Sequence, residues 1–509
     1  MTNIVKCGDN DLATSYEMQE TTSAISDEIG GEFLSRRAAI LNIRISPRFE
    51  LESSQIQILR SPDQFYSVLK GKILKAKRRI YLSTLYIGTK EHELIETIRH
   101  ALKKSPELRI SILTDALRGT RETPNPCCAS LLAPLVEEFG EERVEIRMYH
   151  TPNLTGIKKR IVPRRINEGW GLQHMKLYAI DDELIVSGAN LSNDYFTDRQ
   201  DRYHVFSSAQ IAEYFERVHQ AICKLSFAVL PSKEPAGYIL EWRKDNLCPS
   251  PLDDPNSFVK HASVRLESLI HQGTQAAKPV PASSTLVYPL LQFTQLLKPD
   301  TSTELPAMRT ILSSLAKPGF ENSKWTFTAG YFNMTPEVRQ LLLNSKPASA
   351  TVIAASPWAN GFYGSKGVSG MLPAAYSHLT RQFLNAVARK GLNDRISVKE
   401  WRRGTVNEPG GWTYHAKGLW ITFPNENAPS ISLVGSSNYT KRSYSLDLEA
   451  NALIVTRDKD LMKRLGEEES WLQDYAKKVD VDDFAKTERR VGFHVRIAMW
   501  IVAVLGGAL

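Results

Sequence analysis

Cysteines and long apolar runs are scarce in this sequence. The cysteines are scattered and include no Cys-x-x-Cys pair, so neither a disulfide framework nor a zinc cage is indicated; they are Cys7, Cys127, Cys128, Cys223 and Cys248. No uninterrupted apolar stretch reaches the roughly 18 residues that a transmembrane helix needs. Because no His/Cys cluster has metal-ligand spacing either, the sequence predicts no bound metal and no required cofactor. An auxiliary divalent cation stays open.

Acidic residues are outnumbered by basic ones. There are 64 Lys and Arg against 56 Asp and Glu, which gives a net charge of +8 and a pI near 9.0. This balance favours anionic partners such as phosphates, nucleic acid or acidic lipid surfaces. The segment Met1 to Glu32 is instead acidic and has a single lysine, unlike an Arg-rich mitochondrial presequence. We assign residues 1–50 as a segment that is poorly ordered or related to targeting.

The chain ends in a short apolar stretch. It begins at Ile497, carries Trp500 and follows a basic group made of Lys486, Arg489, Arg490 and Arg496. The stretch is short for a membrane span but suits a helix that lies in the membrane interface, anchored by aromatic and basic side chains. A terminal helix that docks on the protein's own core is the alternative interpretation of residues 486–509.

The two halves of the chain repeat one pattern. A strand, a helix and a second strand follow one another at residues 78–88, 90–105 and 108–117, and again at 325–333, 335–345 and 349–356. Each half continues with a basic cluster, Asn-Glu, a glycine and His-x-Lys, and then a strand that ends in a small-residue turn with asparagine. We interpret the repetition as a tandem duplication.

The duplication predicts an α/β fold with two lobes. Each lobe is expected to be a mixed, mostly parallel sheet flanked by helices. We place lobe 1 at residues 51–235, with its motif at about 168–195, and lobe 2 at residues 306–485, with its motif at about 409–443. Residues 236–305, rich in proline, serine and threonine, are expected to connect the lobes.

The repeated motifs are His174 with Lys176 and His415 with Lys417. On a strand, residues i and i+2 point to the same face, so each half offers an imidazole beside a fixed cation. Phosphoryl transfer uses such groups, because the imidazole can attack phosphorus or move a proton while the cation holds the non-bridging oxygens. We therefore expect one active site at the pseudo-twofold interface between the lobes.

Other side chains near the motifs could complete this site. The candidates for binding phosphate oxygens, beside the two lysines, are Asn190, Ser436 and Asn438. A histidine nucleophile keeps one ring nitrogen free, and a carboxylate on the other nitrogen fixes that tautomer. Asp201 and Glu449 follow the histidines of their own halves at broadly similar distances, and we expect them to orient the histidines.

The first motif, HMKLYAID, is a complete H-x-K-x4-D pattern made of His174, Lys176 and Asp181. It resembles the phospholipase D superfamily, and the resemblance counts Asp181 with the catalytic motif. The second copy, HAKGLWIT, has Thr422 in the place of the aspartate. Since that copy lacks the carboxylate, we expect Asp181 to be structural rather than a proton carrier.

Four longer segments resemble the eukaryotic phosphatidylglycerophosphate synthases over about residues 55–455: GLQHMKLYAIDD, SGANLSNDYFTDRQDRY, ANGFYGSKGVSGMLPAAY and GGWTYHAKGLW. The resemblance implies transfer of a phosphatidyl group from CDP-diacylglycerol to glycerol 3-phosphate, with release of CMP, on the route to cardiolipin. It also implies a mitochondrial enzyme, peripheral on the inner membrane, whose partners are these substrates and an anionic membrane surface and not nucleic acid.

For this reaction we expect His174 to attack the phosphorus and form a phosphohistidine, and His415 to act as the base for the incoming alcohol. The last ionisation of the leaving phosphate lies near about pH 6, so protonating it gains little at neutral pH. The candidates for binding the acceptor phosphate are basic residues upstream of the motifs: Arg164, Arg165, Arg402 and Arg403, with Lys158, Lys159 and Arg160.

A strand end that opens a helix supplies candidates for a nucleotide site, namely Tyr86, Gly88 and Thr89. Asp115, Arg118 and Arg121 fit an ordinary ion pair between strand and loop better than a cleft wall.

Other activities of the superfamily are the alternatives. They are a phosphatidylserine synthase-like enzyme and a nucleic-acid phosphodiesterase such as tyrosyl-DNA phosphodiesterase, whose motifs both lack the aspartate that Asp181 supplies here. A catalytically idle membrane scaffold is disfavoured because both histidines and both lysines are present.

Overall fold

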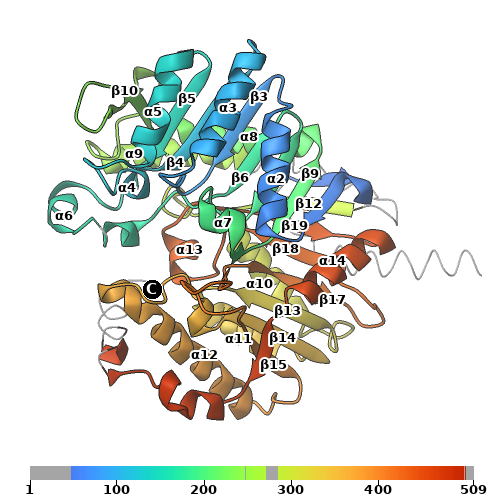
Figure 1. Ribbon diagram of the computed structural model, residues 1–509. Helices are drawn as coiled ribbons and strands as arrows, with labels where there is room; N and C mark the ends of the chain where they lie inside the picture. Colours follow the sequence, from blue (N-terminus) through green and yellow to red (C-terminus); the bar gives the residue numbers. More distant parts are fainter. Residues whose placement is uncertain are drawn as a thin grey trace, which may run out of the picture.

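The structure, a computed structural model, describes residues 47–164, 166–246, 248–270, 285–493, 495–497 and 499. These residues form two lobes, drawn one above the other in Figure 1, and each lobe is built on a nine-stranded sheet. The predicted N-terminal segment lies outside the described residues as far as position 46, and the predicted C-terminal helix lies outside them from position 500 onward.

Lobe 1 contains the first sheet, with the strand order β11-β10-β5-β4-β3-β6-β7-β9-β2. Its strands are β2 (Ile56–Leu59), β3 (Arg79–Ser83), β4 (Arg109–Asp115), β5 (Val144–Tyr149), β6 (Leu177–Ile180), β7 (Glu183–Ser187), β9 (Tyr203–Ser207), β10 (Phe227–Pro231) and β11 (Tyr238–Glu241). Helices cover both faces of this sheet: α2 (Pro62–Ile73), α3 (His92–Lys104) and α5 (Cys128–Phe139) on one, and α8 (Ala209–Cys223) with α9 (Pro255–Ile270) on the other. The short helices are α4 (Ala116–Gly119), α6 (Gly156–Ile161) and α7 (Asn193–Thr197).

Lobe 2 contains the second sheet, with the strand order β1-β12-β19-β18-β17-β13-β14-β15-β20. Its strands are β1 (Phe49–Leu51), β12 (Thr285–Gln292), β13 (Lys324–Ala329), β14 (Ser349–Ala355), β15 (Ile396–Trp401), β17 (Lys417–Thr422), β18 (Ile431–Gly435), β19 (Glu449–Val455) and β20 (Ala476–Val479). The helices α10 (Glu304–Ser314), α11 (Pro336–Asn344) and α12 (Leu372–Arg389) pack on one face, and α14 (Lys459–Trp471) packs on the other. A short helix, α13 (Lys441–Ser445), follows the turn after β18.

The duplication is visible in the strand order. The run β5-β4-β3-β6-β7-β9 of lobe 1 matches the run β15-β14-β13-β17-β18-β19 of lobe 2, element for element. The prediction of two tandem α/β lobes with mixed sheets is confirmed. The prediction that each sheet is mostly parallel is wrong.

Parallel pairing is confined to the strands joined by helical crossovers. In lobe 1 these pairs are β3 with β4 and β4 with β5, and in lobe 2 β13 with β14 and β14 with β15. The strands that follow each His-x-Lys motif are joined by short turns, which force antiparallel pairing. Antiparallel pairs therefore outnumber parallel pairs in the part of both sheets that the structure describes.

Residues 236–305 do more than connect the lobes. Their strand β11 extends the first sheet by pairing with β10, and α9 covers that sheet. Strand β12 pairs from Leu286 to Gln292 with β19 in the second sheet, and β1, from the N-terminal side of lobe 1, pairs with β12. The sequence boundaries at 51 and 305 therefore do not coincide with the limits of the sheets.

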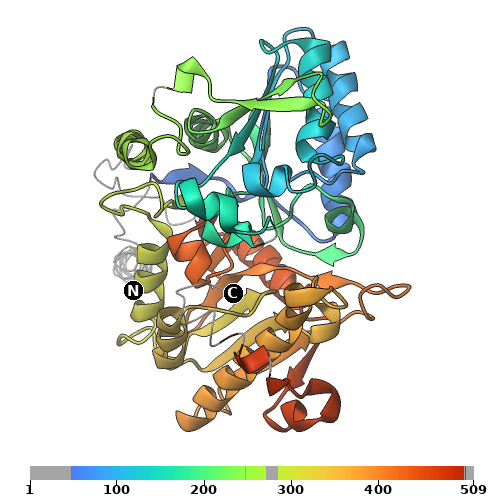
Figure 2. The same cartoon turned by 90° about the vertical axis from the view of Figure 1, so that its left-hand side faces the viewer.

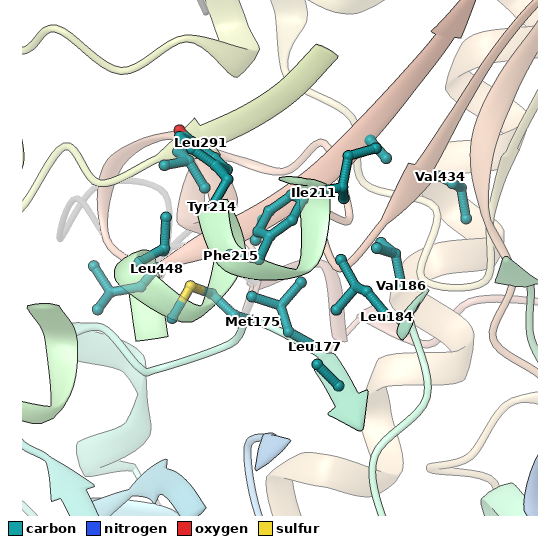
Figure 3. Close-up of a cluster of buried hydrophobic side chains, with 14 of the residues drawn as sticks. Met175, Leu177, Leu184, Val186, Ile211, Tyr214, Phe215, Leu291, Val434 and Leu448 are labelled. Atoms are coloured by element: carbon teal, nitrogen blue, oxygen red, sulfur yellow. The ribbon is translucent and has the colours of Figure 1, made fainter. Parts of the chain in front are cut away.

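One apolar cluster joins the lobes. Figure 3 shows Met175 and Leu177 of lobe 1 in the same buried cluster as Val434 and Leu448 of lobe 2, together with side chains of α8. Apolar burial of this kind is the main favourable term in folding and association. We infer that the two lobes fold against each other as one body, which fixes the geometry of any site between them.

Candidate active site

The two His-x-Lys motifs are held at the interface by backbone pairing between the lobes. The His174 amide donates to the Leu448 carbonyl at 2.9 Å, just before Glu449. In the mirrored contact, the His415 amide donates to the Gln200 carbonyl at 2.8 Å, just before Asp201. The second contact belongs to a two-stranded parallel pair of β8 (Arg199–Gln200) and β16 (Thr413–Tyr414).

This pairing crosses the carboxylates between the lobes. Nδ1 of His174 lies 3.0 Å from both carboxylate oxygens of Glu449, and Nδ1 of His415 lies 2.7 Å from Oδ2 of Asp201. The two predicted carboxylates thus meet the histidines, but each serves the histidine of the other half. An Nδ1–H that donates to a carboxylate leaves Nε2 with its lone pair free.

The two lysines are buried beside the histidines. Each Nζ donates to the carbonyl of its own motif histidine at 2.6 Å. Burial lowers the pKa of Lys176 to about 7 and that of Lys417 to about 8. Burial also holds the pKa values of both histidines well below their usual range, with the adjacent lysine as the next cause, so both imidazoles are neutral at pH 7 in the empty site.

A cavity of about 350 Å³ opens between the lobes over these groups. His174 and His415 both line it, together with the two predicted asparagines, Asn190 and Asn438. Asn190 donates from Nδ2 to the Tyr195 hydroxyl at 3.1 Å, and that hydroxyl lies 3.4 Å from Nε2 of His415. The buried Oδ1 of Asn438 has no partner among the described residues. The motifs therefore converge on one polar cavity.

Ser436 occupies a different place from the one predicted. Its hydroxyl donates to Oε2 of Glu449 and accepts the Ala450 amide at 3.1 Å, and it is fully buried without lining the cavity. Its pseudo-equivalent in lobe 1 is Gly188, where a Cβ would lie 2.6 Å from Oδ1 of Asp201. Ser436 holds an orienting carboxylate rather than a phosphate oxygen.

Asp181 lies far from the histidines, at the other end of β6. Its carboxylate accepts the backbone amides of Lys77, Arg78 and Arg79 at 2.9–3.1 Å, and the residue itself has a positive φ of 50° in the β6–β7 turn. Seven residues of extended chain separate it from His174 by about 20 Å. Asp181 is therefore a structural residue and not a member of the catalytic set, as the threonine at the equivalent position 422 indicated.

The basic residues predicted to bind the acceptor phosphate do not line the cavity as far as the structure describes them, and Lys158, Lys159 and Arg160 lie exposed on α6. Arg164 is exposed and donates to the Thr123 carbonyl, Arg402 stacks over Trp358 and Arg403 over Trp412, while Arg165 lies outside the described residues. The described arginines contact a loop carbonyl or an aromatic ring instead, through a hydrogen bond or a cation–π interaction.

Four other arginines line the cavity: Arg118, Arg121, Arg199 and Arg442. For Arg118 and Arg121 the sequence favours an ordinary ion pair, and neither Arg199 nor Arg442 was among the predicted site residues. Arg199 pairs with Asp194 at 2.9 Å, and Arg442 with Asp447 at 3.1 Å, where Arg442 Nε has no partner in the described structure. Arg199 and Asp447 each precede the orienting carboxylate by two residues, and Asp194 and Arg442 each follow the cavity asparagine by four, so the two ion pairs occupy equivalent positions with their charges exchanged.

The predicted nucleotide segment is split. Tyr86 lines the cavity, with the Arg118 guanidinium 4.1 Å from its ring centroid, but Gly88 packs against Glu91 and Ser192, and Thr89 does not reach the cavity. Asp115 is fully buried below and accepts the amides of Arg118 and Gln173 at 2.9 Å, so it supports the cavity floor. Burial raises the pKa of Asp115 to about 8.

The Gly-Leu-Trp of the second motif accommodates an arginine from lobe 1. Arg202, fully buried, pairs with Glu468 of α14 at 2.8 and 2.9 Å and lies 3.8 Å from the Trp420 ring centroid. A Cβ at Gly418 would collide with its guanidinium. The asymmetry between the two motifs therefore reflects a buried ion pair that crosses the interface next to Asp201.

No group of three or more His, Cys, Asp or Glu is arranged to hold a metal ion within the described ranges. In the same part of the chain, no helix has the length and apolar character to cross a bilayer.

Known proteins resemble the chain in fold and in sequence. Phosphatidylserine synthase of Haemophilus influenzae matches with a TM-score of 0.68 over 92% of this chain and 97% of that one, at 19% identity, which shows the fold alone. Residues 69–222 match the family model described as cardiolipin synthase, PLD-like domain.

Relatives of closer sequence carry one name, CDP-diacylglycerol–glycerol-3-phosphate 3-phosphatidyltransferase. The Saccharomyces pastorianus protein is 45% identical over 97% of this chain and 95% of its own length. The human protein, named as mitochondrial, is 35% identical over 89% of this chain and 83% of its own length. With such identity over nearly the whole chain, this protein belongs to the family of CDP-diacylglycerol–glycerol-3-phosphate 3-phosphatidyltransferases.

Proposed function

We propose that this transferase moves the phosphatidyl group of CDP-diacylglycerol to glycerol 3-phosphate and releases CMP. The observation that carries the proposal is the single cavity lined by His174 and His415, each held by a carboxylate of the other lobe. The relatives' name supports these substrates over serine or a nucleic acid. Membership of this transferase family also favours phosphatidyl transfer over phosphodiesterase activity.

In the first step, Nε2 of His174 attacks the phosphorus attached to diacylglycerol. The bond from this phosphorus to the oxygen of CMP breaks, CMP leaves with the electron pair, and a phosphohistidine remains. Glu449 stabilises the positive charge on the ring through Nδ1–H. The asparagine amides, which line the cavity, hold the non-bridging oxygens, while Lys176 and Lys417 supply positive charge from their buried positions beside the histidines. An anion there restores the charge of lysines whose pKa burial has lowered.

In the second step, Nε2 of His415 takes the proton of the glycerol 3-phosphate hydroxyl. The alcohol oxygen attacks phosphorus, the P–N bond breaks, and His174 regains its lone pair. The lowered pKa of His415 keeps it neutral and ready to accept this proton, and Asp201 stabilises the imidazolium that forms. The acceptor enters from the side that CMP has left, because in-line attack occurs opposite His174.

Arg199 is our candidate for the acceptor phosphate. It lines the cavity in the strand that pairs with the His415 segment, with Nε 3.0 Å from the Thr413 hydroxyl. Gly361, from the segment that resembles the family, allows its close approach, since a Cβ there would lie 2.8 Å from Nη2. A planar guanidinium binds a phosphate through two parallel hydrogen bonds.

The reaction is tested by incorporation of radiolabelled glycerol 3-phosphate into lipid by the purified chain. We expect a labelled phospholipid that depends on CDP-diacylglycerol, and its loss in His174→Ala and His415→Ala. Incorporation of labelled serine in place of glycerol 3-phosphate would assign the synthase alternative. Absence of any lipid product, with cleavage of a nucleic-acid phosphodiester, would overturn the proposal.

We infer a mitochondrial setting from the relatives of mouse and human, which are named as mitochondrial. The product's route to cardiolipin and a peripheral position on the inner membrane are part of this proposal. Subcellular fractionation with carbonate extraction tests it, and recovery of the protein outside mitochondria would contradict it.

A further inference from the structure

The short helix α6 has no buried residue. Ile157 and Ile161, one helical turn apart, are 74% and 73% exposed, and Ile166 just beyond is also exposed. A six-residue helix is marginal in water without a packing partner. The segment from Thr151 to Asn167 carries five basic residues and no acidic one. An apolar face flanked by cations is typical of segments that bind an anionic bilayer.

Two other segments near the cavity share this composition. Val368, in the 3-10 helix Gly367–Met371 that leads into α12, is 66% exposed beside Lys366. Phe493 and Ile497, 75% and 41% exposed, flank Arg496. Residues 359–372 and 489–497 contain no acidic side chain. Six of the ten large hydrophobics exposed in the described structure thus fall in three acid-free segments.

Two of these segments border the cavity, and the third lies close to the second. The loop after α6 supplies Glu168 and Leu172 to the cavity wall, and the segment before α12 supplies Phe362. The C-terminal segment begins at Arg489, whose guanidinium lies 5.7 Å from the ring centroid of Trp358, directly before residues 359–372. Figure 1 places α6, the start of α12 and the dark red segment on the left-hand side, and Figure 2 turns this side to the viewer.

The cavity size gives a reason for such a face. A volume of about 350 Å³ accommodates a headgroup of drug-like size but leaves the two acyl chains of a diacylglycerol outside. Acyl chains outside the cavity are unfavourable in water and stay in the bilayer. The mouth of the cavity must therefore lie at the bilayer surface.

We propose that α6, the 3-10 helix Gly367–Met371 and residues 489–493 with 495–497 together form the face that docks on an anionic phospholipid bilayer, with α6 inserting Ile157 and Ile161. This inference rests on the proposed function for its substrate, and it deepens that function by naming the docking surface. The basic side chains contact lipid phosphates, while the isoleucines enter the acyl boundary. The headgroup then reaches the histidines without leaving the membrane plane.

The test is co-sedimentation of the full chain with vesicles of phosphatidylcholine, alone or mixed with phosphatidylglycerol. We expect binding to the mixed vesicles that weakens with salt, and about tenfold weaker binding for Ile157→Asp/Ile161→Asp and for Lys158→Glu/Lys159→Glu/Arg160→Glu. Val264→Asp is the matched control, because Val264 is 70% exposed on α9, away from the cavity lining, and should bind like the parent.

Activity in two lipid presentations separates this proposal from the proposed function. The α6 variants should lose activity on vesicles yet keep it on CDP-diacylglycerol in detergent micelles, whereas a wrong function leaves the parent inactive in both. Unchanged vesicle binding by both α6 variants, or an equal loss in Val264→Asp, would overturn the proposal. So would a dimer of the parent that the α6 variants disrupt while vesicle binding persists, since this face would then bind a second copy.

Discussion

At the scale of single residues, each histidine depends on a carboxylate that arrives from the other lobe. Glu449 receives a further hydrogen bond from Ser436, whereas Asp201 approaches through the space that Gly188 leaves. The sequence identified both histidines, both lysines and both carboxylates, because their types and motif context are local. It could not show which carboxylate meets which histidine, since the crossed pairing arises only when β8 pairs with β16 and Gln173 pairs with Leu448.

Removing either carboxylate should impair a different step. In Glu449→Gln, the amide no longer stabilises the charged His174 ring, and we expect exchange of labelled CMP into CDP-diacylglycerol to fall by about 10³-fold or more. Asp201→Asn should reduce glycerol 3-phosphate transfer by a similar factor while CMP exchange falls less. If both variants lose exchange and transfer in equal proportion, the division of roles is wrong.

Anion binding should weaken as the pH rises. The pKa values of about 7 for Lys176 and about 8 for Lys417 mean that these lysines lose their protons between pH 7 and 9 in the empty site. The affinity for sulfate, whose charge is constant in this range, should fall by up to about tenfold per pH unit for each lysine that titrates. Calorimetric titration measures it, with Lys176→Met as the variant whose pH dependence should be reduced. An affinity that increases with pH would contradict the assignment.

At the scale of elements, the positions of the strands and helices followed from the sequence better than their pairing did. Strand β3 and helix α3 lie within the predicted segments, since their apolar residues recur at the spacing that each element requires. The antiparallel pairing around the motifs was missed because a central strand buried on both faces reads alike in either direction. Strand β12 was missed because Pro289 and its turn-rich surroundings suggested a linker.

We expect Asp181, in the β6–β7 turn, to contribute to stability and not to catalysis. Asp181→Ala removes the acceptor of three backbone amides and places alanine at a positive φ, so we expect unfolding free energy to fall by about 1–3 kcal/mol. Asp182→Ala, in an exposed ion pair with Arg78, is the matched control and should change it by less than about 1 kcal/mol. Guanidinium denaturation gives the stability, and kcat of folded Asp181→Ala should stay near the parent value. A collapse of kcat without loss of stability would restore a catalytic role.

At the scale of the whole molecule, the lobes are joined by an apolar core and by one deeply buried polar network. Glu468 of α14 accepts hydrogen bonds from Arg202, His204 and Trp420, and its partners hold the pKa of its carboxyl well below the usual range. No repeat pattern in the sequence could reveal this network, because lobe 2 has Ala450 where lobe 1 has Arg202. It is a product of the way the duplicated halves have diverged at their interface.

Loss of the buried Glu468 carboxylate should destabilise the protein much more than loss of an exposed carboxylate. Glu468→Gln leaves the Arg202 charge buried without its counter-ion, and we expect unfolding free energy to fall by about 3–5 kcal/mol. The neighbouring Glu467, half-exposed beside Lys463, provides Glu467→Gln as a control with a change of less than about 1 kcal/mol. Equal effects of the two substitutions would show that the buried pair does not hold the lobes together.

Both lobes build one site, and in our proposal His174 receives the phosphatidyl group there while His415 serves as the base. The most direct measurement is rapid quenching of the enzyme with CDP-diacylglycerol labelled at the lipid phosphate, followed by mapping of the labelled residue by mass spectrometry. We predict an acid-labile label on His174 that accumulates in His415→Ala and is absent from His174→Ala. Label on His415, or no covalent label in an active enzyme, would contradict it.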